Sequence, residues 1–300
     1  MKNIQTTVIG SYPVTIDTME FIKTYFLQKK TDQKWKRYIK TAVQKMLDAG
    51  IDIITDGQTR DPFIQLFARK LKGCRIRNRV EIIDKIEYTK PITIEDQKYV
   101  KTLLPKNKKL KGVITGPYTL TRAATDLHYM DEKQLAFDFA YALKQEAENL
   151  QKHVDIISID EPFFSEQVPE YGKELISIIT KNLRRPTTLH VCGDIRKNIS
   201  QILEMPVDIL SHEFKGIPEL LNEFKQYSFQ QKICLGSVRS DNVTVENVEE
   251  IILHIKKAID ILGNKIIHIS PDCGQRFLPP QIAYQKLKNL VEAGRIINER

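Results

Sequence analysis

The feature that most constrains the fold is a regular alternation between short apolar runs and longer amphipathic stretches along the 300 residues. Short apolar runs are typical of buried strands, and apolar residues spaced three and four apart are typical of helices with one buried face. The runs that predict strands are 6–9, 52–55, 112–115, 154–159, 187–190, 207–211, 232–236 and 265–269. The segments that predict helices are 34–49, 62–72, 132–153, 170–182, 196–204, 218–227, 245–262 and 281–298. Eight strands, each followed by a helix, predict the α/β class and a closed (β/α)8 TIM barrel, with an open doubly wound sheet as the alternative.

One segment departs from this alternation. Residues 74–94 combine β-branched residues with a rough alternation of apolar and polar positions, which is typical of a β-hairpin. We therefore expect a hairpin inserted after the second βα unit. No internal repeat, low-complexity tract or linker is visible, so residues 1–300 are expected to form a single barrel domain.

Composition narrows the classes of protein that fit. With 41% hydrophobic and 28% charged residues the chain is an ordinary globular protein. No apolar stretch is long enough to span a membrane, and the first residues lack the pattern of a signal peptide, so we expect a cytoplasmic protein without a membrane partner. The net charge of +8 permits an acidic partner such as nucleic acid. The lysines are spread over many segments without a nucleic-acid motif, which favours a solvated basic surface.

The four cysteines bear on chemistry rather than on disulfides. A cytoplasmic location makes Cys74, Cys192, Cys234 and Cys273 candidates for thiols, metal ligands or core residues. Cys234 lies inside an apolar run and is expected to be a core residue.

Polar and metal-binding residue types gather after the predicted strands. In a barrel the active site forms at the carboxyl ends of the strands. The short segments that follow strands here are 10–13, 56–58, 160–162, 190–193, 211–213 and 270–274. This asymmetry predicts an active-site face at one end of the barrel.

Four of these strand-end residues predict a metal site. His190 and Cys192 are two residues apart, so in an extended strand end both side chains point the same way. Glu213 ends the next strand and Cys273 follows the last one. One imidazole, two thiolates and one carboxylate form a tetrahedral, borderline-soft set that favours one Zn²⁺ over magnesium, calcium or manganese.

Such a zinc ion favours chemistry on a thiol. Two thiolates and a carboxylate overcompensate its charge, so the ion is a poor source of hydroxide but still lowers the pKa of an incoming thiol. Four protein ligands normally mark a closed structural site. One ligand must therefore loosen to admit substrate, and Glu213 is the natural candidate, with His212 beside it as a stand-in. Alkyl transfer to sulfur fits this site better than hydrolysis.

The remaining strand-end groups suit an amino-acid substrate. Asp160 could pair with an α-ammonium group. The backbone amides of Gly10 and Ser11, with the Ser11 hydroxyl, could bind an α-carboxylate, although this segment could equally be a plain turn.

Together these segments resemble the catalytic half of cobalamin-independent methionine synthase. The resemblance rests on Ile9-Gly10-Ser11-Tyr12-Pro13, Asp56-Gly57-Gln58, Ile159-Asp160-Glu161-Pro162, His190-Val191-Cys192-Gly193, Glu213 and Ser270-Pro271-Asp272-Cys273-Gly274, which span nearly the whole chain in the family's order. It implies a zinc-binding barrel that transfers a methyl group to L-homocysteine, forming L-methionine. It also implies that His190, Cys192, Glu213 and Cys273 are the zinc ligands, and that Ile9, Gly10, Ser11, Gln58 and Asp160 bind homocysteine.

The departures from the family pattern concern the methyl donor. The chain has about half the length of the long enzymes, Ala123 stands where they have a folate-stacking tryptophan, and Asp241 lies near the position of their histidine proton donor. Gln58 replaces a glutamate, whereas Glu166 matches a glutamate that contacts folate. The chain is more similar to the short archaeal methionine synthases. That resemblance implies a methylated corrinoid as donor, either methylcobalamin or an acidic corrinoid methyl-carrier protein.

Three other functions stay open on the sequence. A corrinoid:coenzyme M methyltransferase would use a similar zinc set, but coenzyme M has no ammonium group for Asp160. A folate-dependent methionine synthase would share the acceptor and differ in the donor. A zinc-stabilised nucleic-acid-binding protein would show strong salt-dependent retention on DNA or RNA.

Overall fold

The computed structural model describes residues 4–15, 31–60 and 63–299. Its main sheet has eight strands in the order β1-β11-β10-β9-β8-β7-β5-β2, and each neighbouring pair is parallel. A parallel bridge between Thr7 and Ile53 joins the two outer strands β1 and β2. The sheet thus closes on itself, and the predicted (β/α)8 barrel is confirmed.

The barrel strands are short and nearly all buried. Their bounds are β1 Gln5–Thr6, β2 Ile53–Ile54, β5 Lys109–Thr115, β7 Ile156–Asp160, β8 Thr187–His190, β9 Ile209–His212, β10 Lys232–Val238 and β11 Ile266–Pro271. Each falls on one of the predicted apolar runs, because strands covered on both faces have near-continuous apolar sequences.

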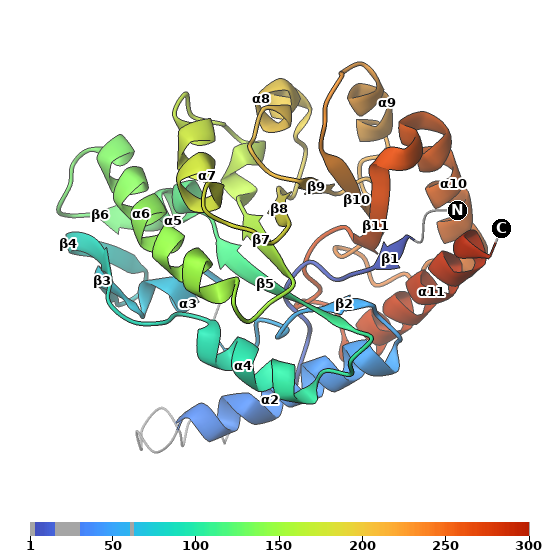
Figure 1. Cartoon of the computed structure of the whole chain (residues 1–300), viewed down its shortest axis with the longest axis horizontal. Helices are drawn as coiled ribbons and strands as arrows, with labels where there is room; N and C mark the ends of the chain where they lie inside the picture. The colour runs from blue at the N-terminus through green and yellow to red at the C-terminus, as the bar shows by residue number, and fades with distance from the viewer. Residues whose placement is uncertain (1–3, 16–30, 61–62, 300) are drawn as a thin grey trace.

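Helices surround the barrel (Figure 1). They are α2 Thr31–Asp48, α3 Phe63–Ala68, α4 Ile94–Leu103, α5 Pro117–Ala123, α6 Glu132–Leu150, α7 Gly172–Thr180, α8 Ile199–Leu203, α9 Leu220–Lys225, α10 Val248–Leu262 and α11 Pro280–Asn298, with short 3-10 turns η1 Pro162–Ser165, η2 Arg196–Asn198 and η3 Gly263–Lys265. The side chain of Asn298 on α11 bonds both the N–H and the C=O of Ile4, which ties the last helix to the start of β1. None of the helices within the described ranges has the length and hydropathy needed to cross a membrane.

The predicted hairpin is present between α3 and α4. It consists of β3 Leu71–Ile76 and β4 Val80–Tyr88, which pair antiparallel. A strand that was not predicted, β6 Ala124–Asp126, pairs parallel with β4 and completes a three-stranded sheet beside the barrel (Figure 1).

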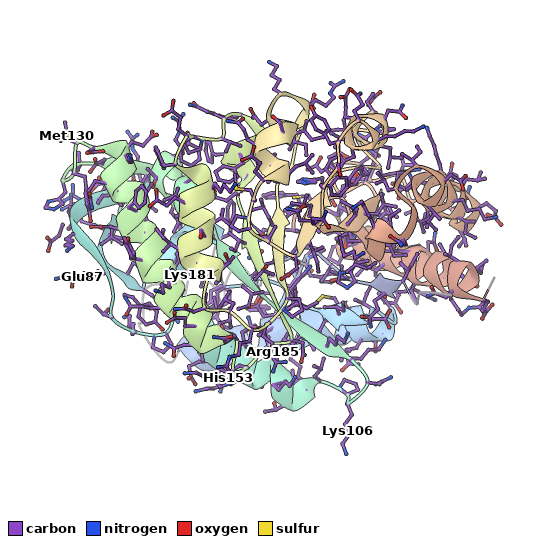
Figure 2. The ribbon with its side chains drawn as sticks, turned by 45° about the horizontal axis from the view of Figure 1, so that its top comes forward. Glu87, Lys106, Met130, His153, Lys181 and Arg185 are labelled. Atoms are coloured by element: carbon purple, nitrogen blue, oxygen red, sulfur yellow. The ribbon has the colours of Figure 1, made fainter. Side chains whose placement is uncertain are left out.

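The two ends of the barrel are formed by different loops. Figure 2 shows Met130, in the loop from β6 to α6, at the opposite edge of the molecule from Lys106, in the loop between α4 and β5. The exposed cations Lys106, Lys181 and Arg185 all precede barrel strands and so belong to the amino ends of those strands. The predicted site residues follow strands and therefore belong to the other end.

A buried carboxylate organises the turn that follows β5. Glu161 is fully buried and accepts hydrogen bonds from the backbone N–H groups of Tyr118 and Thr119 and from the Thr119 hydroxyl. It thereby satisfies the free N–H groups at the start of α5. A Cβ added to Gly116 would lie 2.1 Å from the Glu161 carboxyl carbon, so only glycine fits there.

Gly116→Ala is therefore expected to lower the free energy of unfolding by about 3 kcal/mol, because overpacking costs roughly 1–3 kcal/mol and the Glu161 hydrogen bonds are strained as well. Gly263→Ala is the matched control: among the described residues, nothing beyond its chain neighbours and its own helix lies within 4 Å of the added Cβ, and only the backbone conformation (φ 61°, ψ −132°) opposes the change. That control should cost about 1–2 kcal/mol. Urea denaturation of both variants measures the difference, and equal losses would contradict the role given to Glu161.

Candidate metal centre and substrate site

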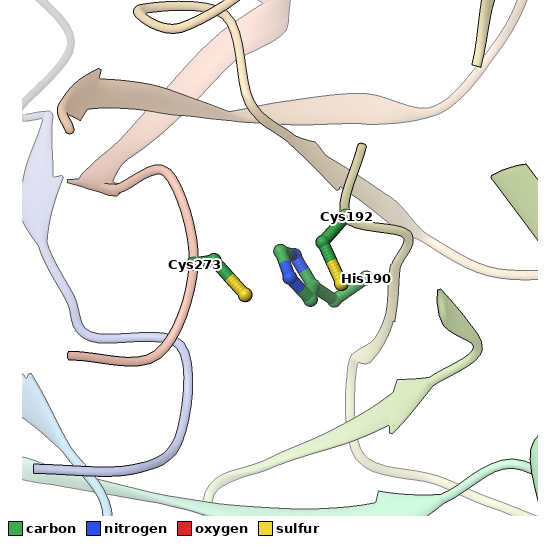
Figure 3. A group of neighbouring side chains, drawn as sticks. All are labelled: His190, Cys192 and Cys273. Carbon is green, nitrogen blue, oxygen red and sulfur yellow. The ribbon is translucent and has the colours of Figure 1, made fainter. Parts of the chain in front are cut away.

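Three of the four predicted zinc ligands form a cluster at the carboxyl ends of the strands. His190 is the last residue of β8, Cys192 follows it by two residues, and Cys273 follows the end of β11. One ligand atom from each lies within 4.8 Å of those of the other two. Figure 3 shows the Cys273 thiol pointing from its own loop toward the imidazole and the thiol on the facing loop. Residues 81 positions apart in the sequence thus meet where the sequence predicted an active-site face.

The two ring nitrogens of His190 have different surroundings. Its Nδ1 lies 3.2 Å from the Ser211 hydroxyl oxygen. Its Nε2 is buried and has no hydrogen-bond partner in the part of the chain that the structure describes. A buried polar atom without a partner costs roughly 1–3 kcal/mol. An imidazole oriented through one nitrogen with the other unpaired is the arrangement of a metal-binding histidine.

The two thiols and the imidazole influence one another strongly. Contact with Cys192 and burial raise the pKa of the Cys273 thiol well above its usual value, against the opposing influence of His190. Burial lowers the pKa of His190, but Cys273 and the nearby carboxylates outweigh that effect and leave the pKa raised. An added positive charge at this cluster would therefore favour the ionised form of the Cys273 thiol.

This donor set fits a zinc ion. One imidazole nitrogen and two sulfur atoms are borderline-soft ligands that zinc binds tetrahedrally. Cys192 and Cys273 are only half-buried, whereas His190 is 2% exposed. The cluster therefore has a protein side and a side that faces the mouth of the barrel, where a further ligand could bind.

Glu213 lies near this cluster but not in it. It follows β9 directly and is half-buried. Its Oε2 lies 3.9 Å from the point where a Cβ on Gly216 would stand, so the carboxylate is turned toward its own loop. The predicted four-ligand set is therefore present as three clustered ligands and one neighbouring carboxylate.

The loop that carries Cys273 is fixed by a residue that the sequence analysis missed. The hydroxyl of Ser240 donates to the Cys273 carbonyl (2.7 Å) and accepts from the Cys273 N–H (3.0 Å). Ser240 follows β10 by two residues, and its position after a barrel strand was the only signal that could have singled it out.

The predicted carboxylate-binding residues lie against the same loop. The Ser11 carbonyl accepts a hydrogen bond from the Gln275 N–H (2.8 Å). A Cβ on Gly274 would stand 2.3 Å from the Ser11 hydroxyl oxygen, so the two segments touch. Ile9 is buried just before them. The loop after β1 thus packs directly beside Cys273 of the candidate metal centre.

Gln58 adopts a strained conformation over Gly10. Its φ of 44° lies in the left-handed region, where side chains other than glycine are uncommon. A Cβ on Gly10 would stand 2.4 Å from the Gln58 Oε1, so glycine is needed at position 10. The Asp56 carboxylate accepts from the Gln58 N–H (3.0 Å) and holds this turn. Backbone strain that is retained in this way often marks a functional site.

Asp160, the last of the predicted substrate-binding residues, lies beside His190. The two residues are register partners on the neighbouring strands β7 and β8. The Ser158 hydroxyl donates to the Asp160 carboxylate (3.1 Å). Burial raises the pKa of Asp160, while the positive charges of His190 and Lys111 lower it without cancelling the rise. Asp160 is thus a half-buried carboxylate at the mouth, beside the cluster of His190, Cys192 and Cys273.

Cys234 is a core residue, as predicted, since it is 1% exposed and donates to the Ser270 hydroxyl. Asp241, which lies near the expected position of a proton donor, is instead paired with Arg239 at 2.6 Å on the surface.

Comparison with known proteins agrees with this geometry. The family described as the catalytic domain of cobalamin-independent synthase matches residues 4–295. The chain belongs to the cobalamin-independent methionine synthase family. The family predicted from the strand-end motifs is thereby confirmed, and with it the prediction that the chain is an enzyme.

Relatives from archaea match over nearly their full length. A methionine synthase from Methanocaldococcus jannaschii is 36% identical over 97% of this chain and 99% of its own length. A methionine synthase from Saccharolobus solfataricus is 31% identical over 99% of this chain and 95% of its own. The resemblance to short archaeal enzymes is therefore confirmed.

Solved structures share the fold. A B12-independent methionine synthase from Shewanella sp. W3-18-1, in complex with selenomethionine, has a TM-score of 0.82 at 24% identity and covers 99% of this chain. A similar protein from Listeria monocytogenes has a TM-score of 0.78 at 20% identity. At these identities the likeness supports the barrel fold alone.

Proposed function

We propose that this protein transfers a methyl group to the thiol of L-homocysteine, forming L-methionine, at a single zinc ion held by His190, Cys192 and Cys273 with Glu213 as a fourth, exchangeable ligand. The observation that carries the proposal is that His190, whose buried Nε2 has no hydrogen-bond partner among the described residues, clusters with two thiols in an enzyme of this family. When bound, zinc in such a ligand set lowers the pKa of a coordinated thiol and leaves the thiolate nucleophilic. We further propose that the chain works as one barrel domain in the cytoplasm.

The protein's own residues would orient the amino-acid part of the substrate. Asp160 would accept hydrogen bonds from the α-ammonium group, because it is an acidic group at the mouth on the strand beside His190. The N–H groups of Gly10 and Ser11 would bind the α-carboxylate from the loop that touches Gly274. Gln58 would border this pocket from above Gly10, and Ile9 would support it from below.

Two features support an amino acid rather than coenzyme M as acceptor. A substrate that lacks an ammonium group would give the half-buried Asp160 carboxylate no charged donor, and a hydrogen bond to a charged group contributes roughly 1.5–3 kcal/mol. The barrel match to a protein described with bound selenomethionine is consistent with an amino-acid site at this mouth.

The methyl donor predicted from the sequence was a methylated corrinoid, free or on an acidic carrier protein. The family's description as cobalamin-independent does not support that prediction. A cobalamin-independent enzyme is expected to use methyltetrahydrofolate, so the corrinoid donor stays a prediction that the following assay tests.

The test supplies the zinc-loaded protein with homocysteine and either methylcobalamin or methyltetrahydrofolate, and measures methionine by mass spectrometry. We expect methionine to form, to require zinc, and to exceed any methylation of coenzyme M offered in competition. Absence of methionine with both donors, or preference for coenzyme M, would overturn the proposed acceptor. Turnover with methyltetrahydrofolate alone would overturn the corrinoid donor.

A further inference from the structure

Asp272 links the two loops that carry Cys273 and Glu213. It lies between the end of β11 and Cys273 and is 3% exposed. Its Oδ1 accepts from the Lys215 N–H (3.0 Å), and its Oδ2 accepts from the Gly216 N–H (2.7 Å). Lys215 and Gly216 belong to the loop that begins at Glu213. One buried carboxylate thus holds the Glu213 loop against the Cys273 loop.

The reach of Asp272 depends on a glycine in the strand between the two loops. The sheet order is β11-β10-β9, so the side chain must cross β10 to reach the loop after β9 (Figure 1). At Gly236 on β10 an added Cβ would stand 2.1 Å from the Asp272 Oδ1. The Asp272 N–H also donates to the Val238 carbonyl (2.8 Å). Asp272 is therefore held through both its backbone N–H and its side-chain carboxylate.

The Glu213 loop has little freedom beyond the Glu213 side chain. The Glu213 carbonyl accepts from the Ile217 N–H (2.9 Å), which closes the loop on itself. The point where a Cβ on Gly216 would stand lies 3.2 Å from the Asp272 Oδ2 and 3.9 Å from the Glu213 Oε2, so two carboxylates flank this glycine. With its backbone held in place, Glu213 can approach or leave the metal-binding cluster only by rotation of its own side chain.

We propose that Asp272 is a positioning residue that locks the Glu213 loop to the Cys273 loop, so that at a metal held by His190, Cys192 and Cys273 only the Glu213 side chain would be free to make way for the substrate thiol. The inference rests on the proposed function, because it takes Glu213 as the exchangeable ligand.

The test measures the zinc affinity of Asp272→Asn by competition with a chelator, with and without homocysteine. Asparagine keeps the size of the side chain but meets one of the two N–H groups with a donor, which loosens the loop. We expect about 10-fold weaker zinc binding without homocysteine, the lower end of the effect of removing a group that orients a ligand. The deficit should shrink once the homocysteine thiolate replaces Glu213. The absorption spectra of the cobalt-substituted variant and the cobalt-substituted unmodified protein should also differ without homocysteine and become more alike when homocysteine is added.

Glu146→Gln is the matched control. Glu146 on α6 is also fully buried and accepts two backbone N–H groups, those of Ile92 and Thr93, away from the metal-binding cluster. This variant should lose stability but keep the zinc affinity of the unmodified protein. Gly216→Ala offers a milder change in the same loop, with the same sign, if Asp272→Asn does not fold.

A double variant tests the route of the effect. If Asp272 acts through Glu213, its replacement should have no further effect on zinc affinity in a Glu213→Gln background. Equal zinc affinity in Asp272→Asn and the unmodified protein, or an equal deficit with and without homocysteine, would overturn the inference. Failure of the unmodified protein to bind zinc would instead overturn the proposed function.

Discussion

Cys273→Ser is expected to remove methyl transfer and to weaken zinc binding by more than the roughly 10- to 100-fold loss that follows removal of a group that only orients a ligand. His190 and Cys192 both come from the end of β8, and Cys273 is the cluster ligand that comes from another strand end, so its loss would open that side of the site. A serine hydroxyl is a hard, weakly acidic donor and a poor substitute for a thiolate on zinc.

Metal analysis of the purified variant, together with the methionine assay, measures this effect. Cys234→Ser is the matched control, since Cys234 is buried on β10 and bonded to Ser270 away from the cluster. That variant should retain one zinc ion per chain. If Cys273→Ser kept the zinc affinity of the unmodified protein, the metal centre proposed here would be wrong.

Asp160→Asn is expected to raise the KM for homocysteine about 10- to 100-fold, because a hydrogen bond to a charged group contributes roughly 1.5–3 kcal/mol. Asparagine preserves the shape of the side chain and the bond from Ser158, and removes only the charge that faces the substrate. The reacting sulfur is bound elsewhere, so kcat should change much less than KM.

The comparison compound is 4-sulfanylbutanoate, which is homocysteine without its amino group. It should bind the unmodified protein and Asp160→Asn with similar affinity, because neither complex contains an ammonium group. A change in KM of the same size for both compounds would show that Asp160 supports the site without contacting the amino group.

Sequence periodicity did not predict the helices α4 and α5, and both were missed for the same reason. The first turn of α4 begins at Thr93, whose N–H and hydroxyl both donate to Glu146 on α6. The first turn of α5 is held in the same way by Glu161, 42 and 43 residues further along the chain. Both helices are therefore capped by a carboxylate from a distant segment. No local pattern of capping residues could have revealed either of them.

The candidate metal centre likewise has residues that the sequence reveals and contacts that it does not. His190, Cys192 and Cys273 could be found from the sequence because the carboxyl ends of parallel strands meet at one end of a barrel. The position of Glu213 outside their cluster could not, since it depends on a loop held by Asp272 across an intervening strand. Ser240 was missed for the same reason, because its bonds to Cys273 join two loops 33 residues apart.

By itself the sequence predicted the eight strands, the family and the residues at the mouth, and it favoured a closed barrel over an open sheet. Each of these follows from local periodicity or from residue types at strand ends, which are properties of neighbouring positions. Only the tertiary structure decided which helices are capped by distant carboxylates, which of the predicted metal ligands cluster together, and that Glu213 lies outside their cluster. Those outcomes depend on single buried carboxylates that cross between segments, and the free energy of such contacts exists only once the chain has folded.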